Sequence, residues 1–149
     1  MRADDLVGVW HLVSFRELDG AGTPGVGPLG DAPRGRLVYT RDGHVSVHMM
    51  RGPDPGPVPY MGYAGTWRLD GSRIVHRIEV TPRHDWIDTE QTREATLAGG
   101  RLTLHARTRV DGVEHRRVLV WRRDRAQGLS FGSGRPGPRC LVGRPATRA

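Results

Sequence analysis

Alternating apolar and polar positions recur along the chain and are separated by short turn sequences. Five dipeptides of a type that favours tight hairpin turns stand beside such runs: Asp19-Gly20, Asp42-Gly43, Asp70-Gly71, Gly99-Gly100 and Asp111-Gly112. No helical pattern is longer than one turn, and only residues 3–7 fit a short helical plug. The chain between the turns is therefore expected to form β-strands.

The pattern predicts eight strands in meander order, over residues 8–18, 34–40, 44–50, 60–69, 72–80, 89–97, 101–108 and 113–122. Closing such a sheet into an antiparallel up-and-down barrel removes its exposed edges, and eight strands leave room for one small ligand. A sandwich of two sheets is the structural alternative. The connections 19–33 and 51–59 are rich in Gly and Pro and are expected to be mobile flaps.

The basic residues of this chain are distributed unevenly. All 23 are Arg, and the absence of Lys excludes a Schiff-base lysine, a P-loop lysine and a Ser-Lys dyad. Residues 1–121 carry 16 Arg and 15 acids, whereas residues 122–149 carry seven Arg and one acid. We therefore expect a barrel domain over residues 1–122, a flexible basic tail over residues 123–149, and no nucleic-acid binding by the folded part.

The sequence features that bear on cellular location predict a cytoplasmic protein. No apolar run reaches the roughly 18 residues of a membrane helix, so no membrane association is expected. The N-terminus lacks the apolar stretch of a secretory signal. The single Cys140 cannot form an internal disulfide.

Several segments, in consistent order, resemble the bacterial lipocalin-like domain family. They are DLVGVWHLVSF (5–15) with the Gly-x-Trp of lipocalins, RGRLVYT (34–40), DGHVSV (42–47), GTW (65–67), the Trp86 region with QTR (91–93), LAGGRLTL (97–104) and VLVW (118–121). The resemblance covers about residues 5–122. It implies a calycin-type barrel, often with a small-molecule role, but no particular reaction. The segment after Met50 is shorter than the helical insertion of many members, which would leave the barrel mouth more open.

Two short motif matches do not fit their context. GVGPLG (25–30) matches the dinucleotide fingerprint, but its proline, Pro28, opposes the required helix and no βαβ unit surrounds it. GLSFG (128–132) matches a nucleophile elbow, but the last His, His115, and the last acid, Asp124, both precede it, whereas such a hydrolase needs them afterwards. Neither NAD binding nor this hydrolase mechanism is predicted.

No metal site is predicted either. His44 and His48 are four residues apart, which on a strand separates their backbones by about 13 Å. No cluster of ligands from other strands points to a site, and Cys140 lies in the predicted tail. We expect neither a metal nor another cofactor.

Polar residues on apolar strand faces are the candidates for a site inside the barrel, because strand side chains alternate. His76 shares a face with apolar residues from Ile74 to Val80, and Arg93 shares one with Gln91. Both His76 and Arg93 are therefore expected to point inward. A buried Arg needs a carboxylate, backbone carbonyls or an anionic ligand, so an internal ion pair and a ligand contact both stay open for Arg93.

The strand at residues 44–50 is ambiguous, because both of its faces are partly apolar. The resemblance favours an inward face of Ser46, His48 and Met50 and an outward face of Val45, Val47 and Met49. A satisfied or surface histidine is the alternative for His48.

Aromatic residues complete the expected lining. Tyr39 shares a face with Leu37, Tyr63 and Trp67 share one across Gly65, and Trp86 could form a wall at the mouth. The predicted catalytic residues are His76, Arg93 and His48. The predicted ligand-binding residues are Tyr39, Ser46, Met50, Tyr63, Trp67, Trp86 and Gln91. Packing in the core or at a barrel end is the simplest explanation for Trp10 and Trp121, and it is the alternative for Trp67.

Three functions follow from this pattern and stay open. The first is a cofactor-independent cyclase or isomerase acting on an apolar oxygenated metabolite, polyketide- or terpenoid-like, in bacterial specialised metabolism. A cavity would hold the chain in a reactive conformation, His76 or His48 would move a proton, and Arg93 or Tyr39 would stabilise an enolate or alkoxide. The second is a non-catalytic binder or carrier of a similar hydrophobic small molecule. The third is an interaction module with a filled core.

The first strand bears on oligomeric state. Val9, Val13 and Phe15 are expected on its outer face, where they could support a homodimer.

Overall fold

The computed structural model of the chain describes residues 1–53 and 55–125. Its elements in chain order are α1 (Ala3–Leu6), β1 (Gly8–Leu18), β2 (Pro24–Val26), β3 (Arg34–Tyr39), β4 (His44–Met50), β5 (Tyr60–Asp70), β6 (Arg73–Val80), the 3-10 helix η1 (His84–Trp86), β7 (Glu90–Ala98), β8 (Arg101–Val110) and β9 (Val113–Arg123). None of the helices within these residues is long and apolar enough to cross a membrane. The predicted tail from residue 126 onward, with Cys140, lies outside the described residues.

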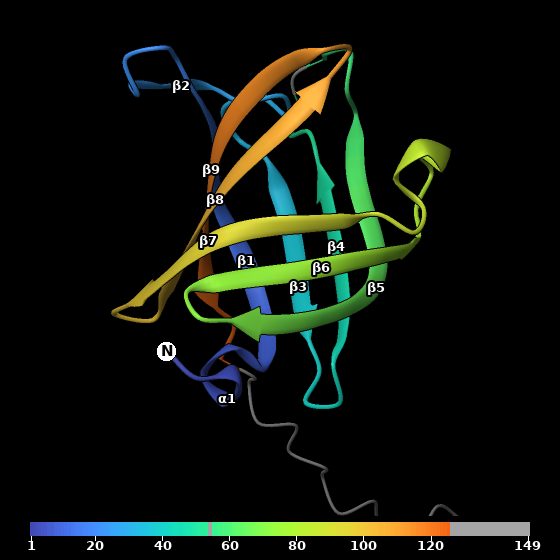
Figure 1. Ribbon diagram of the computed structural model, residues 1–149. Helices are drawn as coiled ribbons and strands as arrows, with labels where there is room; N and C mark the ends of the chain where they lie inside the picture. The colour runs from blue at the N-terminus through green and yellow to red at the C-terminus, as the bar shows by residue number, and fades with distance from the viewer. Residues whose placement is uncertain (54, 126–149) are drawn as a thin grey trace, which may run out of the picture.

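The strands form one antiparallel sheet that closes on itself. From β3 to β9 each strand pairs with the next, β1 pairs with β3, and a pairing between β1 and β9 completes the ring (Figure 1). Of the nine strands in the described residues, eight form this barrel, and the short β2 extends the sheet beside the second half of β1. The prediction of an eight-stranded up-and-down barrel is confirmed, and the sandwich alternative is wrong.

A β-bulge in β1 changes which side chains of its second half point into the barrel. The pairing with β9 shifts between Leu12 and Ser14, so that one extra residue stands on β1. Trp10 before the bulge and Phe15 after it are both buried in the barrel core. The expectation that Phe15 lies on the outer face is therefore wrong, because regular alternation does not continue through a bulge.

The inward face of β4 is the opposite of the one expected from the resemblance. Val45, Val47 and Met49 are buried, whereas Met50 is 49% exposed and His48 is also exposed. Strand pairing explains the outcome, since Val45 lies opposite Tyr39 and Val47 opposite Leu37, and these partners also face the core. The expectation that Ser46, His48 and Met50 point inward is wrong. When the alternation of a strand is assigned one residue out of phase, every side chain of that strand is placed on the wrong face.

A second irregularity lies where β5 meets the end of β6. Ala64 pairs with Val80 but Gly65 pairs with Ile78, so Glu79 is the extra residue. A side chain at Gly65 would put its Cβ 1.8 Å from the carbonyl oxygen of Arg77. Val80 consequently points outward and is 68% exposed, contrary to the expectation that it shares the inner face with His76.

One end of the barrel is closed by α1. Leu6 is fully buried, and the indole Nε1 of Trp10 donates a hydrogen bond of 2.9 Å to its carbonyl oxygen. The guanidinium of Arg123 stacks 4.3 Å from the Trp10 ring and donates to the carbonyl of Val7 at 2.9 Å. The predicted helical plug is thus present and is tied to the last strand.

The connection over residues 19–33 packs against the barrel. β2 pairs with β1, Leu29 is fully buried in the core, and Arg51 donates a 2.7 Å hydrogen bond to the carbonyl oxygen of Pro28. The expectation of a free flap is therefore wrong for the part around Leu29, whose apolar side chain is removed from water.

Candidate functional site

Three inward-facing polar side chains form a hydrogen-bonded chain inside the barrel. The hydroxyl of Tyr39 on β3 lies 2.7 Å from Nε2 of His76 on β6. The hydroxyl of Tyr63 on β5 lies 2.6 Å from Nδ1 of the same ring. His76 is 2% exposed, as its alternation with Ile74 and Ile78 predicts. The interior thus contains one histidine whose two ring nitrogens are both occupied by tyrosines.

All three side chains are neutral at physiological pH. Burial, together with the positive charge of Arg93, lowers the pKa of His76 from 6.5 to about 3. Burial raises the pKa of the Tyr63 hydroxyl and raises that of Tyr39 well above 10, with Tyr63 adding to the latter shift. The chain is therefore a relay of neutral donors and acceptors, without an ion pair.

Counting protons shows that this chain has one donor left over. Two hydroxyls and a neutral imidazole carry three N–H or O–H protons, and the two hydrogen bonds use two of them. The tyrosine that accepts the His76 N–H keeps a free O–H, for which the described residues offer no acceptor. Tyr63 borders the central cavity of the barrel whereas Tyr39 does not. When His76 carries its proton on Nδ1, Tyr63 has the free O–H, and a ligand in that cavity can accept it.

The central cavity is small and mainly apolar. Its volume is about 40 Å³, which suits a few water molecules or one end of a ligand. Its apolar walls include Phe15, Leu37, Val47, Met49, Met61, Leu104 and Leu119. Among these walls, Nε of Arg117 and Nε1 of Trp121 are buried without a hydrogen-bond partner in the described residues, although the side chains are only 8% and 1% exposed. The cavity thus combines an apolar lining with unsatisfied donors.

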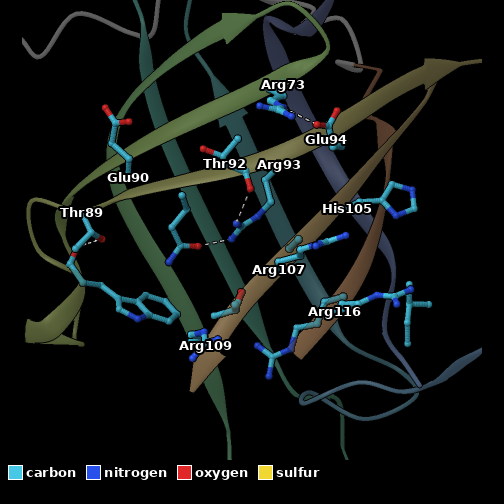
Figure 2. A pocket seen from close by; sticks show the side chains of 16 residues that line it. Arg73, Thr89, Glu90, Thr92, Arg93, Glu94, His105, Arg107, Arg109 and Arg116 are labelled. Carbon is cyan, nitrogen blue, oxygen red and sulfur yellow. Dashed lines mark hydrogen bonds and ion pairs between the residues drawn. The ribbon is translucent and has the colours of Figure 1, made fainter. Parts of the chain in front are cut away.

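The barrel wall opens between β7 and β8. Their pairing runs from Arg93–Ala106 to Ala98–Arg101. The first three residues of β7 pair only with β6, and residues 107–110 of β8 pair only with β9. A pocket of about 840 Å³ spans this separation. Figure 2 shows arginines from both strands and from β9 around it, with the inward-pointing Arg93 in the middle. We call this pocket the lateral opening.

A third cavity shares lining residues with these two. It has a volume of about 250 Å³ and lies among the loops at the end of the barrel opposite α1, against Pro28, Val58 and Pro82. Trp86 and Arg117 border the end cavity, the central cavity and the lateral opening alike. These two side chains therefore stand where the three spaces meet.

Arg93 and Arg117 differ in how their charges are balanced. Arg93 donates to the side-chain oxygen of Gln91 and, at 3.3 Å, to the carbonyl of Thr92, with no carboxylate partner among the described residues. Nε of Arg117 lies 3.8 Å from Glu17, whose carboxylate is also hydrogen-bonded to His115. Burial lowers the pKa of Arg117. Of the two alternatives for Arg93, the described residues do not provide the internal ion pair.

The structure brings most of the sequence-predicted residues to this region. Tyr63, His76, Trp86, Gln91 and Arg93 border the central cavity. Tyr39 reaches it only through His76. Trp67 packs 4.7 Å from the Tyr39 ring and donates a 3.0 Å hydrogen bond to the carbonyl of Thr40, which indicates a packing contact.

Three predicted residues lie on the outer surface instead. Oγ of Ser46 lies 3.1 Å from Nε2 of His48, and Nδ1 of His48 lies 2.5 Å from the hydroxyl of Tyr60. Met50 is exposed beside them. The structure therefore separates His48 from His76 by the barrel wall.

Sequence reasoning missed Arg117 and gave Trp121 only a packing role. Both share the inward face of β9 with Leu119, so the alternation that found His76 and Arg93 would also have found Arg117. The arginines of the lateral opening on β8 left no such signal, because their importance depends on the missing pairing with β7. In the described part of the chain, no group of three or more His, Cys, Asp or Glu side chains is placed to hold a metal.

Comparison with known families agrees with this architecture. The sequence model described as the lipocalin-like domain matches residues 7–59 and 56–124. The chain belongs to the lipocalin-like domain family. No curated protein matches this lipocalin-like chain.

Solved structures similar to this lipocalin-like barrel share little sequence with it. A lipocalin-like protein from Bacteroides uniformis has 18% identity and a TM-score of 0.50, over 80% of this chain and 99% of that one. An uncharacterized protein from Bacteroides eggerthii has 18% identity and a TM-score of 0.47, over 80% and 100%. The fluorescent protein UnaG has 16% identity and a TM-score of 0.42, over 83% and 100%. The first of these likenesses supports the fold alone.

Proposed function

We propose that this lipocalin-like barrel binds a small molecule whose apolar body lies against Trp86. The observation that carries the proposal is the meeting of three cavities at Trp86 and Arg117. A ligand there would have apolar walls in the central and end cavities and polar side chains in the lateral opening, the usual composition of a small-molecule site.

The cavity sizes indicate how such a ligand would sit. The central cavity, at about 40 Å³, is too small for a whole metabolite. The lateral opening, at about 840 Å³, falls in the range of roughly 300–1,000 Å³ that is usual for ligand pockets. The bulk of the ligand would therefore occupy the opening and the end cavity, with only one group reaching the central cavity.

The protonation of the interior favours binding over acid–base catalysis. A general base works best when its pKa lies near the operating pH, and the pKa of His76 is about 3. His48 is on the outer surface, where it cannot act on a molecule inside the barrel. His76 is better suited to hold Tyr63 in place than to remove a proton.

A neutral apolar dye tests this proposal without involving charge. Nile red should bind the purified protein saturably, with a blue-shifted emission. Trp86→Ala should weaken binding at least tenfold because it removes the wall shared by the three cavities. Ile87→Ala is the matched control, because Ile87 is the exposed neighbour and borders none of them. Failure of the dye to bind would favour a filled core, whereas equal weakening by both substitutions would show that the dye does not lie against Trp86.

A cofactor-independent cyclase or isomerase is the second candidate, and the free O–H of the tyrosine chain favours it. Tyr63, backed by His76, would donate to a carbonyl oxygen of a polyketide- or terpenoid-like substrate, while Arg93 would stabilise the enolate or alkoxide. A molecule that copurifies with the protein from its own host, identified by native mass spectrometry, would supply the substrate class. Turnover that is lost in Tyr63→Phe while binding persists would support the enzyme; affinity changes without turnover would support the carrier.

A further inference from the structure

The lateral opening carries an excess of positive charge. Six arginines border it, namely Arg73, Arg93, Arg107, Arg109, Arg116 and Arg117. Its two carboxylates are already engaged by arginines, Glu90 at 3.0 Å from Arg68 and Glu94 at 2.6 Å from Arg73. Within the described residues, Arg93, Arg107, Arg109 and Arg116 have no ion-pair partner. A pocket of this kind concentrates anions.

The deeper polar groups are also donors that lack acceptors. Nε of Arg117 and Nε1 of Trp121 are buried and have no hydrogen-bond partner in the described residues, and both residues border the central cavity. Neither group can accept a hydrogen bond, and the spare O–H of the tyrosine chain needs an acceptor as well. Buried donors without partners are costly, so an occupant of the cavity should bring oxygen acceptors.

Two guanidinium groups beside the central cavity indicate which kind of acceptor the ligand carries. Arg93 and Arg117 border both the central cavity and the lateral opening. Guanidinium groups pair preferentially with oxyanions and can bind them through two parallel hydrogen bonds. Glu17 balances Arg117 only in part, at 3.8 Å and while bound to His115, and Arg93 has no carboxylate partner among the described residues.

We infer that the ligand of the barrel is an apolar carboxylic acid, with its carboxylate between Arg93 and Arg117 and its apolar body along Trp86 into the end cavity. This assignment rests on the proposed binding function. The carboxylate supplies acceptors for the two guanidiniums and brings a negative charge to a positive site. The apolar body meets Met61, Val58 and Pro82 in the end cavity.

The test compares two ligands that differ only in their polar ends. Decanoate and 1-decanol are each titrated at neutral pH against Nile red bound to the full chain. Decanoate should displace the dye at least tenfold more effectively than decanol. In Arg93→Gln and in Arg117→Gln, the affinity for decanoate should fall at least fivefold, while that for decanol stays within twofold of its original value.

Arg101→Gln is the matched control, since Arg101 is an exposed arginine of β8 that borders none of the cavities, and it should leave both affinities unchanged. Thermal denaturation establishes that each variant is folded; should Arg117→Gln not fold, the half-buried Arg93 still gives an independent result. Equal affinities for decanoate and decanol would overturn the assignment of a carboxylate ligand while leaving apolar binding intact. A preference for decanoate that survives in every folded variant at Arg93 and Arg117 would have the same meaning. Failure of dye, acid and alcohol alike to bind would overturn the binding function itself.

Discussion

His76 is a titratable side chain that the fold keeps uncharged. It is enclosed by Tyr39 on β3, Tyr63 on β5 and the charged Arg93 on β7, and none of these can stabilise a positive imidazolium as a carboxylate would. The unfolded chain protonates this histidine near pH 6.5, whereas the folded protein does so only near pH 3. Above pH 6.5 both states are neutral. As the pH falls from 6.5 towards 3, the unfolded state gains the proton and the folded state loses relative stability.

This difference predicts a pH dependence that one substitution removes. Between pH 7 and pH 5, His76 should lower the free energy of unfolding by about 2 kcal/mol. His76→Gln keeps a donor and an acceptor for the two tyrosines, so it should fold but lack this part of the pH dependence. Urea denaturation at the two pH values measures the effect, with His44→Gln on the exposed surface as the control. Equal pH dependence in wild type and His76→Gln would contradict the assignment.

Irregular pairing decides which side chains the strands present to the interior. The bulge in β1 turns Phe15 inward, and the irregularity between β5 and β6 turns Val80 outward. The second lies at a close approach of backbones, which at Gly65 leaves no room for a side chain. The interior of the barrel is therefore set by the places where the ladder departs from regularity.

Gly65 offers a direct test of this point. Gly65→Ala should destabilise the protein by about 1–3 kcal/mol or more, because its Cβ would meet the Arg77 carbonyl oxygen at 1.8 Å and the backbones must separate. Gly20→Ala should change stability little, since nothing lies within 4 Å of its Cβ position and its backbone needs no glycine. Chemical denaturation of both variants makes the comparison. A similar effect of the two substitutions would show that the irregularity is not a constraint.

Strand order and the inward placement of His76 and Arg93 could be predicted from alternation and turn residues, because both follow from local sequence. The faces of β4 could not, since valines, methionines and polar residues gave two partly apolar faces, and only pairing with Tyr39 and Leu37 decided between them. Bulges left no signal that alternation can detect. The lateral opening depends on which strand β8 pairs with along its second half, which is a property of the whole sheet.

At the scale of the molecule, α1 covers one end of the barrel (Figure 1). Leu29 partly covers the other end, so the lateral opening in the side wall is the access route that we expect. The separated strands β7 and β8 form the two edges of that access. Molecules entering or leaving would pass between them.

A cross-link across the lateral opening should therefore slow ligand exchange. In a Cys140→Ser background, Thr92→Cys and Arg107→Cys would be joined by a short bismaleimide, and stopped-flow fluorescence would measure Nile red association and release. Both rates should fall about tenfold or more. The matched control joins Thr96→Cys to Thr103→Cys, which are already paired neighbours on the same two strands, and should have no effect. Equal rates in the two cross-linked proteins would place the access route elsewhere.

The bulge in β1 also bears on how the length of this chain can vary in evolution. Trp10 and Phe15 both face the core although five positions separate them, an odd interval that only an extra residue can accommodate. Losing Val13, which stands between the two shifted pairs and whose side chain is exposed, would leave an even interval and the same two aromatic residues inside. In a regularly paired strand a one-residue deletion would turn every following side chain around, but here it is compatible with the same core. Among relatives of this protein, the first strand is accordingly a place where a one-residue difference in length need not signal a different interior.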